Sequence, residues 1–243
     1  MSLSKNQLKL ITSLGQKKYR QKHKLFVAEG IKVVREFLQS SFELHSLFTT
    51  NNAFQAIPSN KVFQISSANL HKISSLKTPN KVLALFHIPE EVDYSNSDLY
   101  VALDSVNDPG NLGTIIRLCD WFGIEHLLCS KETVDCFNSK VVQASMGSLT
   151  RVSIHYLDLI PTFQKLQKPV FIADMDGENV YTSELPSEGI LVLGNEANGV
   201  SVEIKKAADR VVSIPRFGSL KETESLNVAT ATAVLLSEFK RRS

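Results

Sequence analysis

The chain has 243 residues, of which 43% are hydrophobic and 21% are charged. These proportions are average for globular proteins and exclude a chain that is disordered throughout. No apolar run reaches the roughly 18 residues that a membrane-spanning helix requires, and the first residues lack the uninterrupted apolar stretch of a signal peptide. We therefore expect a cytoplasmic protein without a membrane span, and the length favours two domains over one.

The charge is distributed unevenly along the chain. Residues 1–35 contain nine basic residues and one acidic residue, a charge of +8, so the rest of the chain carries −6 within the total of +2. Such asymmetry favours a polyanionic partner for the basic part, although a solvated lysine-rich surface would explain it equally well. The candidate contacts to RNA phosphates are Lys17, Lys18, Arg20, Lys22 and Lys24.

The cysteines and histidines give no sign of a metal site or a disulfide. The three cysteines, Cys119, Cys129 and Cys136, are odd in number and form no C-x-x-C pair. Since a free cysteine packs as a small hydrophobe, we expect three buried, inert thiols. None of the six histidines has metal-like spacing to another, so we expect no bound metal.

The first 90 residues alternate between helical and extended patterns. An amphipathic helix is predicted over 4–14, and a short strand over 25–30 leads into a helix over 31–39. Further strands are predicted over 44–50, 61–66 and 81–88. Residues 1–90 therefore form an α/β unit, and residues 91–98, which lie in a stretch of Pro, acidic, Asn and Ser residues, are the expected linker.

The remaining residues, 99–243, repeat an order of apolar run, turn and helix. The predicted strands begin with 99–106, and the predicted helices are 114–123, stopped by Gly123, and 226–242. Strands that alternate with helices imply a largely parallel sheet covered on both faces. The other predicted strands are 126–130, 169–174, 189–194 and 210–215.

Ligands of parallel sheets usually bind beyond the carboxyl ends of the strands, where the informative loops of this sequence lie. The sequence contains no G-x-G-x-x-G, Walker A, H-E-x-x-H or G-x-S-x-G motif. The loop at 108–113 ends at a helix N-terminus, where Asn111 is predicted as a cap and Arg117 could grip a phosphate. A capping Asn and a surface Arg are the simpler interpretation of this loop alone.

Two further loops carry polar residues of interest. In 194–199, Glu196 lies between two glycines, where it could orient an arginine, although a plain turn explains the same residues. In 213–229, Ser225 is predicted as the N-cap of the last helix. Asn227 would then lie in the first turn, where its intrinsic helix propensity is poor, so capping does not account for it.

Together these segments resemble the SpoU-type (TrmH-like) RNA ribose methyltransferases of the SPOUT superfamily. VNDPGNLGTIIRLCDWFG resembles the first motif of that family, LVLGNEANGVS the second, and SIPRFG followed by SLNVATATAVLL the third. The basic stretch KKYRQKHKLFVAEGIKVVREFL is similar to the N-terminal substrate-binding domain of the family, a small ribosomal-protein-like α/β/α unit. The resemblance covers nearly the whole chain.

The resemblance implies a fold, a cofactor and a reaction. Residues 99–243 would form a trefoil-knotted parallel-sheet domain, which the apolar pattern does not reveal and which ordinary topology rules disfavour. The enzyme would be a homodimer that methylates a ribose 2′-hydroxyl in RNA, ribosomal RNA rather than tRNA. The cofactor S-adenosylmethionine would be held at Leu193, Gly194, Ile214 and Leu226. The functional polar residues would be Asn111, Arg117, Glu196, Ser225 and Asn227.

The implied chemistry suits these residue types, since methyl transfer from a sulfonium requires alignment and a deprotonated hydroxyl but no metal. We expect Arg117 to hold the target phosphate and 2′-hydroxyl, with Glu196 and Asn111 fixing its orientation; a role as general base suits a permanently protonated arginine poorly. The sequence departs from the family pattern in its long loop at 216–224 and in Ala229, where a serine is common.

Two other classes of function compete with this interpretation. A non-catalytic RNA-binding or ribosome-assembly protein that retains the fold would be expected to have lost the polar set, which is present here in full. A methyltransferase of the same superfamily that acts on a base nitrogen would carry different motifs. Fold likeness alone would not decide between these alternatives, and the polar residues favour ribose methylation.

Overall fold

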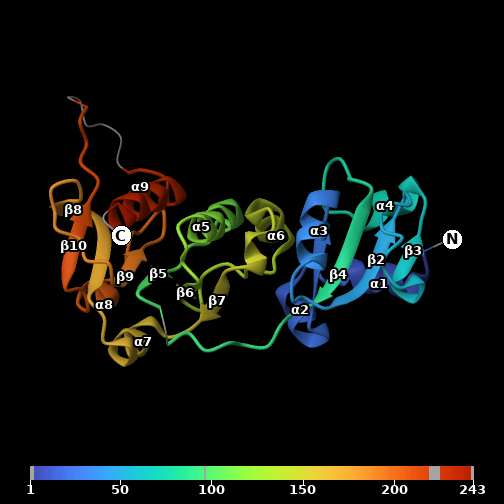
Figure 1. Ribbon diagram of the computed structural model, residues 1–243, viewed down its shortest axis with the longest axis horizontal. Helices are drawn as coiled ribbons and strands as arrows, with labels where there is room; N and C mark the ends of the chain where they lie inside the picture. Colours follow the sequence, from blue (N-terminus) through green and yellow to red (C-terminus); the bar gives the residue numbers. More distant parts are fainter. Residues whose placement is uncertain (1–2, 96, 219–224, 242–243) are drawn as a thin grey trace. The chain divides into compact units, whose positions relative to one another are not determined.

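The computed structural model describes residues 3–95, 97–218 and 225–241. Figure 1 shows the arrangement of the helices and strands. The chain forms two compact units. The first comprises Met1–Glu90 together with Asp135–Thr150, and the second comprises Glu91–Val134 and Arg151–Ser243. Each unit is a separate arrangement of helices around its own sheet.

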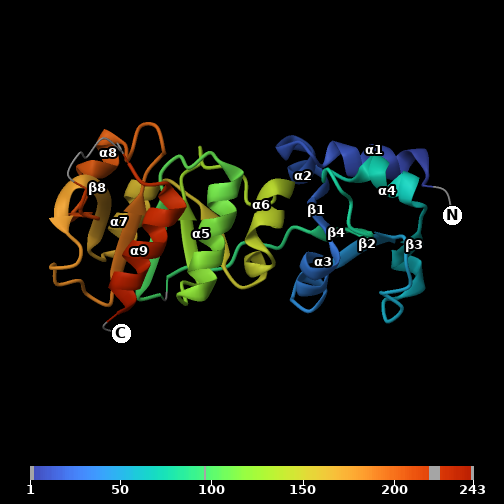
Figure 2. The ribbon, with the colours of Figure 1, turned by 90° about the horizontal axis from the view of Figure 1, so that it is seen from above.

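The first unit is built on a four-stranded sheet with the order β1-β4-β2-β3. The pairs β1/β4 and β2/β4 are antiparallel, and β2/β3 is parallel. Figure 2 shows α1 and α4 on one face of this sheet and α3 on the other. The elements are α1 (Lys5–Ser13), α2 (Lys17–His23), β1 (Leu25–Glu29), α3 (Ile31–Leu38), β2 (Leu44–Thr49), the 3₁₀ turn η1 (Ser59–Lys61), β3 (Val62–Gln64), α4 (Ser67–Ile73) and β4 (Val82–His87).

The alternating side chains of β1 explain the two helical layers. All five residues of this strand are buried, and successive side chains of a strand point to opposite faces. Leu25 and Val27 pack in one cluster with Ile11 of α1. Phe26 packs on the other face against Phe37 of α3, with ring centroids 5.3 Å apart. The predicted α/β/α unit is confirmed.

A segment from the later part of the chain completes the first unit. Residues 135–150 contain α6 (Ser139–Ser145) and the 3₁₀ turn η2 (Ser148–Thr150). The ring of Phe137 lies 4.8 Å from that of Phe26, and the Asp135 carboxylate bonds to Arg20. The linker expected at 91–98 would place residues 135–150 in the second domain. In the structure they pack with the first unit.

The second unit contains a six-stranded sheet with the order β10-β8-β9-β5-β6-β7, and every pair in it is parallel. The parallel sheet that the sequence predicts is confirmed. The elements are β5 (Leu99–Leu103), α5 (Pro109–Trp121), β6 (His126–Cys129), β7 (Ser153–Tyr156), α7 (Leu159–Leu166), β8 (Val170–Asn179), β9 (Gly189–Leu193), α8 (Val202–Lys205), β10 (Arg210–Ser213) and α9 (Val228–Lys240).

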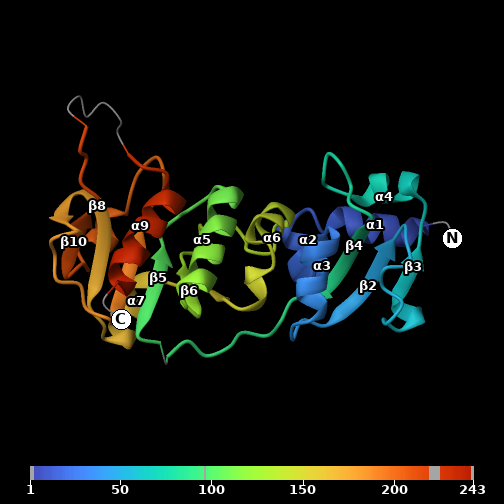
Figure 3. The ribbon, with the colours of Figure 1, turned by 45° about the horizontal axis from the view of Figure 1, so that its top comes forward.

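Helices cover both faces of this sheet, as Figures 1 and 3 show. Helices α5 and α9 lie side by side on one face, where Phe239 of α9 meets Phe171 of β8 at a centroid distance of 5.2 Å. Phe163 of α7 and Ile204 of α8 pack against the other face in a cluster with Tyr100. Because the central strands are buried on both faces, they appear in the sequence as continuous apolar runs.

Within the described ranges, no helix is long and apolar enough to cross a membrane. The trefoil knot that the family resemblance implies stays a prediction.

Candidate functional site

Three side chains from distant parts of the sequence meet beyond the carboxyl ends of β5 and β9. The amide nitrogen Nδ2 of Asn111 donates a hydrogen bond of 2.7 Å to Oε1 of Glu196. The amide nitrogen of Asn227 donates one of 2.8 Å to Oδ1 of Asn111. We call these three residues the polar cluster. The structure therefore brings together three of the five polar residues that the sequence analysis selects.

Asn111 is positioned by the start of α5. Asp108 is the N-cap of this helix, and its carboxylate accepts a hydrogen bond of 2.8 Å from the backbone N–H of Asn111. The prediction that Asn111 caps the helix is wrong, because Asp108 does so, with Pro109 in the first helical turn. The Asn111 side chain is therefore available for both bonds within the polar cluster.

Asn227 is positioned by the start of α9, where it is itself the N-cap. Its Oδ1 accepts hydrogen bonds from the backbone N–H groups of Ala229 (3.0 Å) and Thr230 (3.2 Å). The prediction of Ser225 as the cap is wrong, because the helix begins at Val228. Ser225 is exposed and lies outside the polar cluster. The amide oxygen of Asn227 thus caps the N-terminus of α9, and the amide nitrogen joins the polar cluster.

Glu196 lies in a tight loop that follows β9. Asn195 and Gly199 exchange two backbone hydrogen bonds of 2.9 and 2.8 Å across this loop. The Asn195 side chain donates a bond of 2.7 Å to the carbonyl of Ser105 and so ties the loop to the end of β5. Gly194 has no room for a side chain, since an added Cβ would lie 2.1 Å from the carbonyl carbon of Gly199. The exposed Glu196 is therefore carried by a fixed backbone.

Arg117 does not join the polar cluster of its own chain. It lies six positions after Asn111 on α5, which places it about 9 Å along the helix and about 120° around it. The side chain is exposed, and it forms no hydrogen bond or ion pair with the part of the chain that the structure describes. The arginine and the carboxylate expected to orient it are thus apart within one chain.

The residues expected to hold the cofactor occupy the ends of β9 and β10 and the entry to α9. The main-chain N–H and C=O groups of Gly194, Ile214 and Leu226 form no hydrogen bond to other described residues. The carbonyl of Leu193 accepts one of 2.9 Å from Asp104. Main-chain donors and acceptors without partners beside apolar side chains suit a nucleoside such as the adenosine of S-adenosylmethionine. The residues present therefore fit this cofactor.

The basic residues predicted to bind RNA do not all remain available. Lys17, Lys18, Lys22 and Lys24 are exposed. Arg20 is 3% exposed and donates from Nε (2.9 Å) and Nη2 (2.6 Å) to the Asp135 carboxylate. A further bond of 2.8 Å runs to the carbonyl of Leu14. The assignment of Arg20 as an RNA contact is corrected, because its guanidinium is committed inside the first unit.

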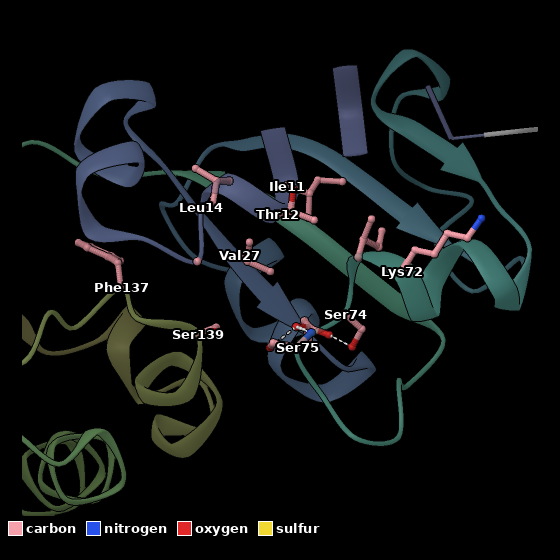
Figure 4. Close-up of a pocket in the computed structure, with 12 residues that line it drawn as sticks. Ile11, Thr12, Leu14, Val27, Lys72, Ser74, Ser75, Phe137 and Ser139 are labelled. Carbon is pink, nitrogen blue, oxygen red and sulfur yellow. Dashed lines mark hydrogen bonds between the residues drawn. The ribbon is translucent and has the colours of Figure 1, made fainter. Parts of the chain in front are cut away.

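Two cavities formed by described residues lie away from the polar cluster. Figure 4 shows one of about 210 Å³ in the first unit. The buried Glu29 carboxylate at its wall accepts hydrogen bonds from Ser74 Oγ and from the N–H (2.9 Å) and Oγ (2.6 Å) of Ser75. The other, of about 240 Å³, lies beyond β5, β6 and β7 in the second unit. Neither cavity is lined by a residue of the polar cluster.

The described part of the chain holds no group of His, Cys, Asp or Glu residues suited to a metal ion. All three cysteines are buried thiols, as predicted. Burial raises the pKa of the Cys119 thiol, which keeps it protonated and inert. In the long loop at 216–224, which departs from the family pattern, residues 219–224 lie outside the described residues. Ala229 is buried at 5% exposure.

Asp108 and Asn195 hold the two loops in place, and neither was expected from the sequence. An Asp directly before Pro109 is a recognised start signal for a helix and could have identified Asp108. No comparable sequence signal marks Asn195, since its partner is the carbonyl of Ser105, 90 residues away.

The parallel sheet, the main-chain groups at the ends of β9 and β10, and the polar cluster beside them agree with the methyltransferase of the SPOUT type that the sequence resemblance implies. Residues 98–237 match the model of the SpoU rRNA Methylase family, and residues 5–84 match that of the MRM3-like substrate binding domain. The chain belongs to the SpoU rRNA methylase family.

Similar proteins span the whole chain. It is 29% identical over 245 residues to the 23S rRNA (guanosine(2553)-2′-O)-methyltransferase RlmP of Bacillus subtilis, covering 93% of both chains. A solved structure described as an RNA methyltransferase of the TrmH family from Porphyromonas gingivalis is 39% identical, with a TM-score of 0.90 and complete coverage of both chains. The AdoMet-bound rRNA methyltransferase of Sinorhizobium meliloti is 30% identical, with a TM-score of 0.87, covering 100% of this chain and 97% of that one.

Proposed function

We propose that this protein transfers the methyl group of S-adenosylmethionine to the 2′-hydroxyl of a ribose in ribosomal RNA. The observation that carries the proposal is the hydrogen-bonded polar cluster, to which each of the three family motifs contributes one side chain. A protein that had kept only the fold would have no need of this connection. Relatives that are named as 23S rRNA 2′-O-methyltransferases support ribosomal RNA over tRNA.

The chemistry requires positioning more than it requires reactive groups. S-adenosylmethionine, when bound, supplies an electrophilic methyl group on a sulfonium. The chain must place a ribose hydroxyl in line with that methyl group and exclude competing geometries, and such alignment can contribute about 7–11 kcal/mol to lowering a barrier. Asn111 and Glu196 fix one another, and Asn227 fixes both to the start of α9. Arg117 holds the target phosphate and 2′-hydroxyl through its planar fork.

Replacement of Arg117 by Lys tests the role of the fork. Lysine keeps the charge but loses the bidentate geometry, so methyl transfer at saturating RNA should fall well below that of the original protein. Near-normal turnover of R117K would reject the clamp.

We further propose that the active protein is a homodimer and that Arg117 of one copy completes the polar cluster of the other. Arg117 is remote from the polar cluster of its own chain. Trp121, four residues later on α5 and therefore on the same helix face, is 84% exposed. A large exposed aromatic ring beside an exposed arginine is typical of the centre of an interface. Sedimentation of the original protein and of W121A tests this proposal.

The exposed lysines of the first unit are proposed to bind RNA phosphates. We assign substrate binding to residues 1–90, the linker between the domains to residues 91–98, and methyl transfer to residues 99–243. The reaction is proposed to take place in the cytoplasm. Phosphate contacts release counterions, so RNA affinity should fall steeply with salt. Changing Lys17, Lys18 and Lys22 to Ala together should reduce that salt slope, and an unchanged slope would reject the assignment.

The decisive experiment supplies radiolabelled S-adenosylmethionine with unmodified ribosomal RNA and tRNA transcripts in parallel, followed by nucleoside mass spectrometry. A 2′-O-methylnucleoside in ribosomal RNA is the expected product. Label on a base would reject ribose methylation. Absence of transfer, with cofactor binding retained in calorimetry, would favour a substrate in an assembled particle, and absence of cofactor binding would favour a non-catalytic RNA-binding protein.

A further inference from the structure

Two aromatic side chains lie beyond the carboxyl ends of the neighbouring strands β8 and β10, outside every role assigned above. Tyr181 follows β8, and Phe217 follows β10. Their rings stack with centroids 6.3 Å apart and planes inclined by 29°. Phe217 is 83% exposed and Tyr181 is 40% exposed. We call these two residues the aromatic pair.

The backbone under Tyr181 is fixed. Val180 is fully buried, and its N–H donates a bond of 2.9 Å to the carbonyl of Ser213 at the end of β10. The N–H of Tyr181 donates one of 3.0 Å to the side chain of Asn179. Phe217 extends into open surroundings, since it is 83% exposed. One ring is thus held in place, and the other presents its surface to solvent.

The aromatic pair lies on the same edge of the sheet as the polar cluster. Strand β8 is next to β9, which precedes Glu196, and β10 is one strand further. At a strand spacing of about 4.8 Å, β10 lies roughly 10 Å from β9 across the sheet. The last residues of β8, which precede Tyr181, pair with β10 and not with β9. Phe217 also follows Ile214, one of the expected cofactor contacts, by only three residues. The aromatic pair therefore borders the place where methyl transfer would occur.

We propose that the aromatic pair stacks a nucleobase of the substrate RNA beside the nucleotide whose ribose is methylated. The inference rests on the proposed function, because it takes its ligand from the RNA substrate. Unpaired bases of RNA are commonly held by stacking on aromatic side chains, and a π-face accepts any base. The aromatic pair aligns the target strand, while the exposed lysines of the first unit attract its phosphates.

The test compares Phe217→Ala, Phe217→Leu and Phe217→Tyr, with Met175→Ala as the control. Met175 is an apolar residue of β8 that is also exposed, at 53%. Stacking on one aromatic side chain is lost in Ala and in Leu, which is apolar but lacks a planar face, and is kept in Tyr. The measurements are kcat and KM for an unmodified large-subunit ribosomal RNA transcript, the Kd for the same transcript by filter binding, and the Kd for S-adenosylmethionine by calorimetry.

The expected result is a rise of about 5- to 150-fold in KM and Kd for the transcript in F217A and F217L. F217Y and M175A should stay near the original values, and the affinity for S-adenosylmethionine should be unchanged in all variants. Tyr181→Leu should resemble F217A, and Tyr181→Phe should resemble the original protein.

Three results would overturn the inference. Normal RNA affinity in F217L would mean that any apolar side chain suffices. A loss of S-adenosylmethionine affinity would assign the ring to the cofactor, and a change of sedimentation in F217A would assign it to a contact between copies. If the original protein binds the transcript but transfers no methyl group, this contradicts only the proposed activity on the free transcript, since filter binding still tests the aromatic pair.

Discussion

Each unit of this protein contains a polar network that joins residues far apart in the sequence, and the two networks differ in burial. In the first unit, Arg20 bonds to Asp135, 115 residues away, with side chains 3% and 13% exposed. In the second unit, Asn111 bonds to partners 85 and 116 residues away, and Glu196 and Asn227 are exposed. The first network has no open face toward a ligand, whereas the second has one. Burial therefore separates a network that holds the fold from one that can meet a substrate.

The largest effect on stability is expected at Arg20. Arg20→Ala leaves the Asp135 carboxylate without its partner and should lower the free energy of unfolding by about 3–5 kcal/mol. Equilibrium unfolding in urea measures this loss. Arg20→Lys, which keeps the charge without the fork, should recover part of it. If R20A unfolded like the original protein and only RNA binding fell, the corrected assignment of Arg20 would have to be withdrawn.

Asn111 should show the opposite behaviour. Asn111→Ala breaks both bonds of the polar cluster near the surface, so we expect the free energy of unfolding to change by less than about 1 kcal/mol. Misplacement of Glu196 and Asn227 should reduce single-turnover methyl transfer by about 100-fold. Rapid-quench assays at saturating RNA and cofactor measure the rate. An active N111A would mean that the polar cluster is a by-product of loop packing.

The buried His155 of the second unit should make the stability of the protein depend on pH. His155 is 6% exposed, and burial together with the neighbouring His126 lowers its pKa to about 4. In the unfolded chain it titrates near its ordinary pKa of 6.5, so below that pH the unfolded state binds more protons than the folded state. Stability present above about pH 6.5 is therefore lost as the pH falls toward 4, by about 1 kcal/mol between about pH 7.5 and about pH 5.5. Urea unfolding of the original protein and of H155Q at both pH values measures this, and an equal pH dependence in the two proteins would exclude His155 as its source.

Two substitutions separate the two functions of Asn227. Asn227→Ala should lose the helix cap, at about 1 kcal/mol, as well as activity. Asn227→Asp keeps a capping oxygen but loses the amide donor to Asn111, so stability should be retained while methyl transfer falls. Thermal unfolding and single-turnover rates of both variants distinguish the roles. Equal activity in N227D and the original protein would reduce Asn227 to a cap.

Much of the fold follows from the sequence because the strands of the second unit are buried on both faces. Runs such as 99–106 and 189–194 are apolar throughout, and this predicts strands in a parallel sheet. Strand β8 is longer than its apolar run, because its polar last residues pair only with the edge strand β10. Helix α6 is short and has no apolar period long enough to be recognised, and nothing in its own residues indicates that it packs with the first unit.

The proximity of Asn111 and Glu196 was predictable in outline, since loops at the carboxyl ends of parallel strands meet at one edge. The first residues of the helices were less predictable from the sequence. Ser225 and Asn227 are both good caps, and helix boundaries are uncertain by one or two residues. Arg20 lies in the same basic stretch of sequence as the exposed lysines. Only its ion-pair partner Asp135, 115 residues later, distinguishes it from them.

The position of Asn227 has a consequence for heat inactivation. The first turn of a helix frays before the domain unfolds, because local opening costs less free energy than global unfolding. Each such opening of α9 would remove the amide from the polar cluster, although both sheets stay intact. Methyl transfer should therefore decline at temperatures where the protein as a whole is still folded, so that enzymatic activity reports the integrity of a single helical turn.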